Sequence, residues 1–363
     1  MKTAPQRPGR ARYFQYVRWV AAIALLLWIG IRHGDVFHTI HETSLEVSLF
    51  AAAIGLTLLS QLAMSFRWYC LFPRLATATP AIAACQQSFL AAISNYSPLG
   101  DYGGMTIRVA FLIRRGCPRV RDAFLSVFLD RALGLASLIL MSCIAFSIGR
   151  NQFRDEFAPA LHVFQLMTIS GLTAALAIYV LCSHRGIQEL RLVKSFHQRI
   201  TQTLAHLMHQ RRRAAFAVCW TLVSQSCAVL ALTCVAASVA QGQYAPGLIE
   251  NAVILPIVEL SAIVFPTPSG IGVREFAMSQ LYYIAAPDLT MNAATRLGLT
   301  VAIASRLATF LSTLLGLLGT SIVLRHGRNR NDPTSLSSDD PLSLSLNQVS
   351  VQPRASAAKT KNN

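Results

Sequence analysis

The sequence predicts an all-α fold, a polytopic transmembrane helical bundle with two opposed re-entrant or broken-helix hairpins. Hydrophobic residues make up 53% of the 363 residues and charged residues only 13%, whereas soluble domains carry roughly 25% charged residues. Mean hydropathy is +0.45. The basic residues lie between apolar runs, as the positive-inside rule requires. Two pairs of apolar runs are too short to cross a bilayer and are interrupted by proline and glycine.

The composition also limits the function classes. A net charge of +16 would suit nucleic-acid binding, but its placement between apolar runs indicates membrane orientation, and we predict no nucleic-acid partner. The eight cysteines are scattered without zinc-ligand spacing, so no metal site and no cofactor are predicted. The sequence contains no nucleophile elbow, zincin helix or P-loop, so no catalytic residue is predicted.

The first two long apolar runs predict two membrane spans. Residues 1–15 are basic and are expected on the cytoplasmic side. The run at residues 17–31 has no convincing small-residue cleavage signature and is predicted to be a retained span. The run at residues 45–66 returns the chain to the cytoplasm at Arg67 and Arg74.

Residues 81–113 predict the first broken hairpin. Its first apolar run, residues 81–93, has about thirteen residues, whereas crossing roughly 30 Å of hydrocarbon takes about 20 residues. A polar, glycine-rich break follows, and then a second short apolar run ends in arginines. Because basic residues flank both ends, both are expected in the cytoplasm, so the segment enters the membrane and returns on the same side.

The middle of the chain predicts three further spans and one surface helix. Residues 123–148 cross outward, residues 162–182 cross back, and residues 214–240 cross outward again. The connecting segment 183–213 is basic, and its apolar residues recur every three or four positions. This pattern is typical of an amphipathic helix on the inner leaflet, which either anchors the chain or recognises anionic head groups.

The C-terminal part predicts the second hairpin, a last span and a tail. Residues 248–286 contain two apolar runs around a Pro/Gly break, and both ends are expected outside. Residues 297–324 cross inward to arginines that mark the cytoplasm. The polar tail at residues 326–363 is expected to be disordered. The transmembrane domain is thus expected to cover residues 16–325, multi-pass in a cell inner membrane, with both termini cytoplasmic.

Charged residues lie deep in the predicted spans, where each costs roughly 2.5–3.5 kcal/mol on insertion scales. We predict that three arginines and three carboxylates neutralise one another around a shared polar cavity. The arginines are Arg131, Arg274 and Arg306, and the carboxylates are Asp130, Glu259 and Glu275. Guanidinium groups bind phosphate through paired hydrogen bonds, so the cavity is a candidate anion site. The alternative is a closed ion-pair network that only holds the helices together.

Both breaks supply further candidates. At the first break, the candidate anion-binding residues are Asn95, Asp101 and Arg108, and the backbone-breaking residues are Pro98, Gly100, Gly103 and Gly104. At the second break, the backbone-breaking residues are Pro266, Pro268, Gly270 and Gly272. Proline cannot donate a backbone hydrogen bond and glycine adopts conformations that other residues avoid, so helix ends with free N–H groups are expected here. For the glycines of the first break, close helix packing is the alternative.

Three stretches resemble motifs of a known family. They are Asn95…Pro98…Gly100…Gly103-Gly104…Arg108, Ser126…Asp130-Arg131…Gly134, and Glu259…Pro266…Ser269-Gly270…Gly272…Arg274-Glu275. Together they resemble the flippase-like membrane family that includes the transmembrane region of lysylphosphatidylglycerol synthases, over roughly residues 15–325. The resemblance implies an inner-membrane helical bundle with re-entrant segments that moves or binds anionic lipid head groups. Bifunctional members add a C-terminal aminoacyl-transfer domain, but only a short polar tail follows Arg330, so synthase activity is not expected.

Residues and resemblance together predict an integral lipid flippase or lipid-binding transporter. Its partner would be a membrane lipid with an anionic head group, either a phospholipid or a polyprenyl (isoprenoid) lipid. The alternative is a non-transporting accessory protein that partners a lipid-modifying or glycolipid-synthesis enzyme, in which the buried charges are structural. The sequence makes no prediction of the oligomeric state.

Overall fold

A computed structural model of the chain describes residues 45–71, 80–95, 101–115, 120–149, 153, 166, 211–240, 244–264, 267 and 270–330. These residues form eight helices and no strand, which confirms the predicted all-α fold class. Four of the helices are long and apolar enough to cross a membrane. The chain is therefore a multi-pass membrane protein.

The four long helices correspond to four of the six predicted spans. They are α3 (Val47–Leu71), α7 (Val120–Gly149), α10 (Arg211–Ala240) and α13 (Met291–Arg330). Outside the described residues lie the predicted span at 17–31, the predicted span at 162–182 apart from residue 166, most of the predicted surface helix and the tail from 331. Helix α3 continues past the predicted span end at residue 66, so Arg67 lies inside a helix and not in a loop.

Each predicted broken hairpin contains a pair of short helices. Helices α5 (Ala81–Ser94) and α6 (Asp101–Arg114) pack against each other, as do α11 (Leu248–Val264) and α12 (Val273–Ala285). In both pairs the helices are separated by the Pro/Gly break that the sequence predicts. The re-entrant course of the two pairs stays a prediction.

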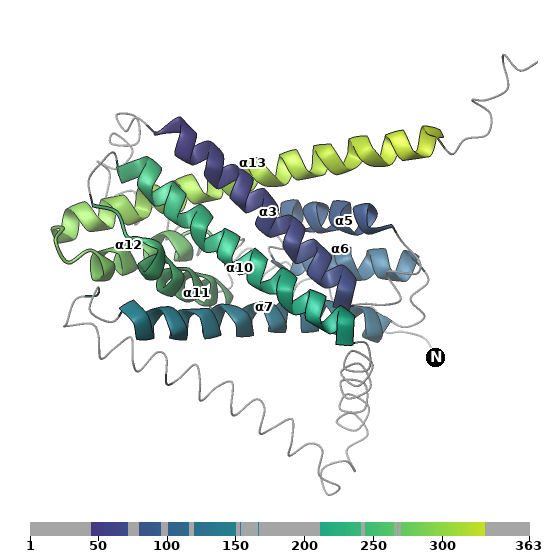
Figure 1. The fold of residues 1–363 in the computed structure, drawn as a ribbon, viewed down its shortest axis with the longest axis horizontal. Helices are drawn as coiled ribbons and strands as arrows, with labels where there is room; N and C mark the ends of the chain where they lie inside the picture. The colour runs from purple at the N-terminus through teal and green to yellow at the C-terminus, as the bar shows by residue number, and fades with distance from the viewer. Residues whose placement is uncertain are drawn as a thin grey trace, which may run out of the picture.

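Helices α3 and α10 lie side by side across the centre of the bundle (Figure 1). The pair α5 and α6 lies toward one end of the molecule, and α11 and α12 lie toward the other. Helix α13 is long enough to contact both α5 and α12. The larger apolar core joins α10, α11, α12 and α13 around Val235, Ile254, Tyr282 and Val301, and a smaller one surrounds Trp68. The central helices therefore connect the two short-helix pairs.

Gly298 allows α13 to approach α12 closely. A Cβ at this position would lie 2.7 Å from the carbonyl oxygen of Met278 and 2.9 Å from Cα of Ser279. Because these are backbone atoms, Gly298→Ala is expected to lower the free energy of unfolding by about 1–3 kcal/mol through overpacking. Thermal unfolding in detergent measures the effect. Gly319→Ala on the same helix, with no heavy atom within 4 Å, is the control, and equal melting temperatures would contradict the close approach.

Candidate functional site

The start of α12 depends on two glycines. Gly270 and Gly272 have φ angles of 66° and 85°, in the left-handed region that other residues rarely adopt. A Cβ on Gly270 would also lie 2.7 Å from Cβ of Ala262. The N–H of Gly272 donates a hydrogen bond of 2.7 Å to Oε2 of Glu275. This carboxylate therefore caps the first turn of α12, where a negative charge is favourable.

Arg306 connects this turn to α13. Its Nε donates to Oε1 of Glu275, and its Nη2 donates to Oε2 of Glu275 at 3.3 Å and to the carbonyl oxygen of Gly270 at 3.0 Å. The Glu275 side chain is only 5% exposed. Both oxygens of one buried carboxylate are thus satisfied by the helix start and by one guanidinium, which fixes the geometry of the break.

A second ion pair beside the first is much more accessible. Arg274 Nη2 donates to Oε2 of Glu259 at 2.6 Å, and their side chains are 32% and 30% exposed. Glu259 lies near the end of α11 and Arg274 in the first turn of α12. Because both side chains are partly open, either can exchange its partner for a ligand at lower cost than the buried Glu275.

A cavity of about 170 Å³ opens beside these charges. Glu259, Arg274 and Arg306 line it together with residues of α3, α10, α11 and α13. Its hydroxyl groups come from Thr57, Ser60, Ser305 and Thr309, and its apolar wall includes Ala228, Ala231, Leu232 and Val235. An apolar pocket with a few convergent polar groups is the usual form of a small-molecule site.

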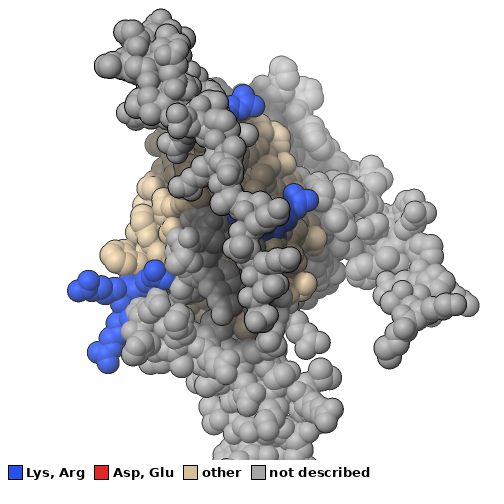
Figure 2. All heavy atoms as spheres, turned by 90° about the vertical axis from the view of Figure 1, so that its right-hand side faces the viewer, with Lys and Arg blue, Asp and Glu red and all other residues tan. Residues whose placement is uncertain are grey.

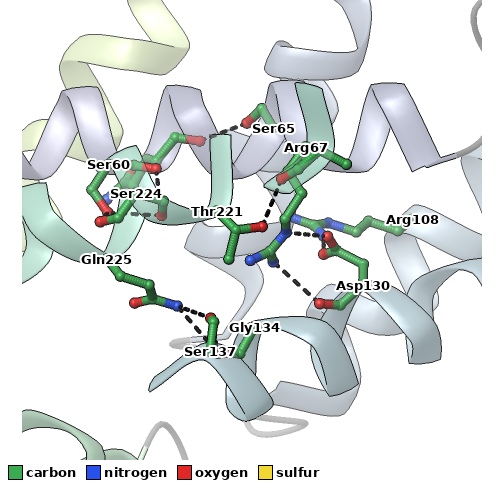
Figure 3. Close-up of polar contacts among 12 residues, drawn as sticks. Ser60, Ser65, Arg67, Arg108, Asp130, Gly134, Ser137, Thr221, Ser224 and Gln225 are labelled. Carbon is green, nitrogen blue, oxygen red and sulfur yellow. Dashed lines mark hydrogen bonds and ion pairs between the residues drawn. The ribbon is translucent and has the colours of Figure 1, made fainter. Parts of the chain in front are cut away.

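A separate charged group lies near the C-terminal end of α3 (Figure 3). We call Arg67, Arg108 and Asp130 the buried triad. Arg67 Nε donates to Oδ1 of Asp130 at 2.8 Å, and Arg108 Nη1 donates to Oδ2 at 3.1 Å. Arg67 Nη2 also donates to the carbonyl oxygen of Asp130 at 3.2 Å. The three side chains are 1–6% exposed, so the triad joins α3, α6 and α7 away from solvent and lipid.

Comparison with known proteins decides the family. The family described as "Lysylphosphatidylglycerol synthase TM region" matches residues 16–316. The chain belongs to this family. No curated protein matches the chain. The cavity and the buried triad both lie inside the matched range, so both belong to the region that this chain shares with the lysylphosphatidylglycerol synthase TM family.

The structure brings together four of the charged residues that the sequence predicts for the site. Glu259, Arg274, Glu275 and Arg306 form two neighbouring ion pairs, and three of them line the cavity. The structure differs from the expected single cavity, because Asp130 is held by Arg67 and Arg108 in a second cluster. Arg131, which was expected to offset a carboxylate, has an exposed side chain.

The remaining candidates lie at the first break. Asn95 follows the end of α5, Asp101 begins α6, and Gly103 and Gly104 are buried in the first turn of α6. A Cβ on Gly104 would clash with Oδ1 of Asn95, so close packing accounts for this glycine. The described residues include the backbone of Asp101 but not its side chain, and Pro98, Gly100, Pro266 and Pro268 lie outside them.

Sequence reasoning missed Arg67. An arginine directly after an apolar run has the appearance of a cytoplasmic loop residue. The signal that could have placed it inside the helix is the apolar continuation Trp68-Tyr69-Cys70-Leu71, which extends α3 by a further turn. A second signal was the depth of Asp130. An isolated carboxylate at that depth is costly, so Asp130 required a basic partner.

Proposed function

We propose that the protein is a lipid flippase or lipid-binding transporter that receives an anionic lipid head group in the cavity between α3, α10, α11, α12 and α13. The observation that carries this proposal is the convergence of Glu259, Arg274 and Arg306 on one cavity. Family membership and the long apolar helices support a multi-pass membrane protein, and the head-group site rests on the geometry of these three residues.

The cavity lies near the middle of the long helices. Ser60, one of its lining residues, is near the centre of α3, roughly 20 Å from one helix end and 16 Å from the other at 1.5 Å per residue. Ionisable side chains near the bilayer midplane are expensive to bury and usually have a functional role. Substrate sites near the bilayer midplane beside broken helices are also typical of transporters.

The accessible ion pair provides a means of binding. A phosphate could replace Glu259 on the guanidinium of Arg274 and accept a paired hydrogen bond. Arg306 would add a second positive charge at the cavity wall while its bond to the buried Glu275 keeps it in place. The hydroxyl oxygens of Ser305 and Thr309 can accept hydrogen bonds from head-group hydroxyls. The site thus offers charge for the phosphate and polar contacts for its substituent.

The charge distribution supports the membrane orientation expected from the sequence. The C-terminal ends of α3 and α13 and the N-terminal ends of α7 and α10 lie toward the same end of the molecule (Figure 1). Figure 2 views that end, and the described charged residues visible there are Lys or Arg. Exposed arginines at these helix ends include Arg211 and Arg325. By the positive-inside rule this end faces the cytoplasm of an inner membrane.

Lipid transfer in proteoliposomes tests the proposal. Arg274→Gln removes the accessible guanidinium and is expected to slow the movement of a fluorescent phosphatidylglycerol across the bilayer at least about tenfold, since charge-assisted hydrogen bonds contribute about 1.5–3 kcal/mol. Arg325→Gln, an exposed arginine of α13 away from the cavity, is the matched control and should transfer lipid as the wild type does. Equal rates for the two variants would contradict the head-group site.

One observation favours the accessory-protein alternative. Glu259 with Arg274 and Glu275 with Arg306 are already paired, as a purely structural network would be. On this alternative, Arg274→Gln lowers the amount of folded protein and transport is absent from the wild type. A folded but inactive Arg274→Gln variant therefore separates the two functions.

A further inference from the structure

The buried triad is not balanced in charge. Among the described residues it holds two guanidinium groups and one carboxylate, with side chains 6% exposed or less. The cavity cluster, by contrast, pairs two arginines with two glutamates. A network that only holds helices together has no use for an excess positive charge in a membrane interior, because an uncompensated buried charge is costly.

The neighbouring Trp68 offers an unused donor. The guanidinium carbon of Arg108 lies 5.1 Å from the centre of the Trp68 ring. Trp68 is fully buried, and its Nε1 has no acceptor among the described residues. Most buried donors in native proteins have a partner. Within the described part of the chain, the excess charge lacks a second anion and the N–H lacks an acceptor, and one negatively charged acceptor would satisfy both.

We propose that the buried triad is a second anion site, which accepts a singly charged phosphate group during lipid movement. A phosphodiester head group carries one negative charge and would balance the triad. This inference deepens the proposed function and rests on it. Because the triad is closed in this structure, the anion enters when α6 moves Arg108 away from Asp130, and the phosphate then takes the place of the carboxylate on the released guanidinium.

Polar side chains lie between the two sites. Arg67 lies seven residues after the cavity residue Ser60 on α3, about 10 Å along the helix axis. Ser60 and Ser224 exchange hydrogen bonds through their hydroxyls and carbonyl oxygens at 2.9–3.2 Å. Gln225 Nε2 then donates to Oγ of Ser137 at 3.1 Å. Figure 3 shows these two sets of contacts on one side of the triad, and we call them together the polar row.

The last step of this row depends on Gly134. Gln225 Nε2 also donates to the carbonyl oxygen of Gly134 at 3.2 Å. A Cβ on Gly134 would lie 3.2 Å from both Nη1 and Nη2 of Arg67. The absence of a side chain at position 134 therefore allows the guanidinium to face the polar row. The row gives a head group hydrogen-bonding partners on its way from the cavity to the triad.

Charge variants of Arg108 test the inference. Arg108→Gln makes the triad neutral, and Arg108→Lys keeps its excess positive charge. Each variant would be purified in mild detergent with equal amounts of phosphatidylglycerol and phosphatidylcholine, and bound lipids counted by native mass spectrometry. We expect wild type and Arg108→Lys to bind two phosphatidylglycerol molecules in preference to phosphatidylcholine. We expect Arg108→Gln to bind one, with occupancy of the other reduced at least about tenfold. Equal binding to Arg108→Gln and Arg108→Lys would overturn the inference.

Two further measurements complete the test. Arg274→Gln leaves the native triad intact and should keep one of the two lipids. If this variant keeps both lipids, the cavity proposal fails. If it keeps neither, the triad proposal fails. Inorganic phosphate distinguishes the sources of the anion. If it raises the melting temperature of Arg274→Gln but not that of Arg274→Gln/Arg108→Gln, the triad accepts free phosphate. If phosphatidylglycerol alone separates these two variants, the triad accepts a lipid head group, and if neither probe separates them, the inference is overturned.

Discussion

Asp130→Asn is expected to lower the free energy of unfolding by about 3–5 kcal/mol, because it removes the only carboxylate that the described residues place in the buried triad. Asp130 is fully buried and accepts one hydrogen bond from each of two arginines. An asparagine of the same shape offers one acceptor oxygen and turns its NH₂ group toward the other donor. Two guanidinium groups then remain buried without a counter-charge.

Arg131→Gln provides the matched control for this variant. Arg131 is the next residue on α7, and its side chain is exposed. Because a charge within a span is costly, its replacement by a neutral side chain is not expected to destabilise the protein. Unfolding in a denaturing detergent series, followed by circular dichroism, measures both variants. A destabilisation of Asp130→Asn no greater than that of Arg131→Gln would show that the triad does not stabilise α7 against α3 and α6.

Glu275→Ala is expected to have the second largest effect on stability. It removes the cap on the Gly272 N–H and leaves Arg306 without its buried carboxylate. Loss of a cap costs about 0.5–2 kcal/mol, and breaking a buried ion pair costs about 3–5 kcal/mol. Because both effects act on one side chain, we expect a total of about 3–5 kcal/mol rather than their sum.

The same substitution at Glu259 is the control. Glu259 also pairs with an arginine, but its side chain is 30% exposed. Removing an accessible ion pair costs about 1 kcal/mol or less, so Glu259→Ala is expected to fold nearly as stably as the wild type. The same unfolding assay compares the two variants. A cost for Glu259→Ala as large as that for Glu275→Ala would contradict the division into a structural pair and an accessible pair.

The cavity charges could be predicted from the sequence because a charge in an apolar run is expensive. Glu259 and Arg306 stand out for this reason, and Arg274-Glu275 follow a Gly-x-Gly turn. The positive φ angles of Gly270 and Gly272 agree with the expected helix break. What the sequence could not show is the partition of these charges, since exposure depends on how α11, α12 and α13 pack.

The buried triad and the polar row were beyond sequence reasoning. Arg67 and Asp130 are 63 residues apart, and Ser60 and Ser224 are 164 apart. Single serines and glutamines in an apolar helix have no spacing that identifies a partner, because the contact is set by the register of α3 against α10. Arg131 was expected at the same cavity as Asp130. It follows Asp130 in sequence, but adjacent helical residues point about 100° apart, and the structure exposes its side chain.

The most direct test of the central claim is to identify the lipids that stay bound when the protein is extracted gently from its own membranes, using native mass spectrometry. The head-group site predicts an anionic lipid on the wild type and on Arg325→Gln. It also predicts loss of that lipid from Arg274→Gln while the protein stays folded. The same anionic lipid at unchanged occupancy on Arg274→Gln, or no anionic lipid on the wild type, would contradict the claim.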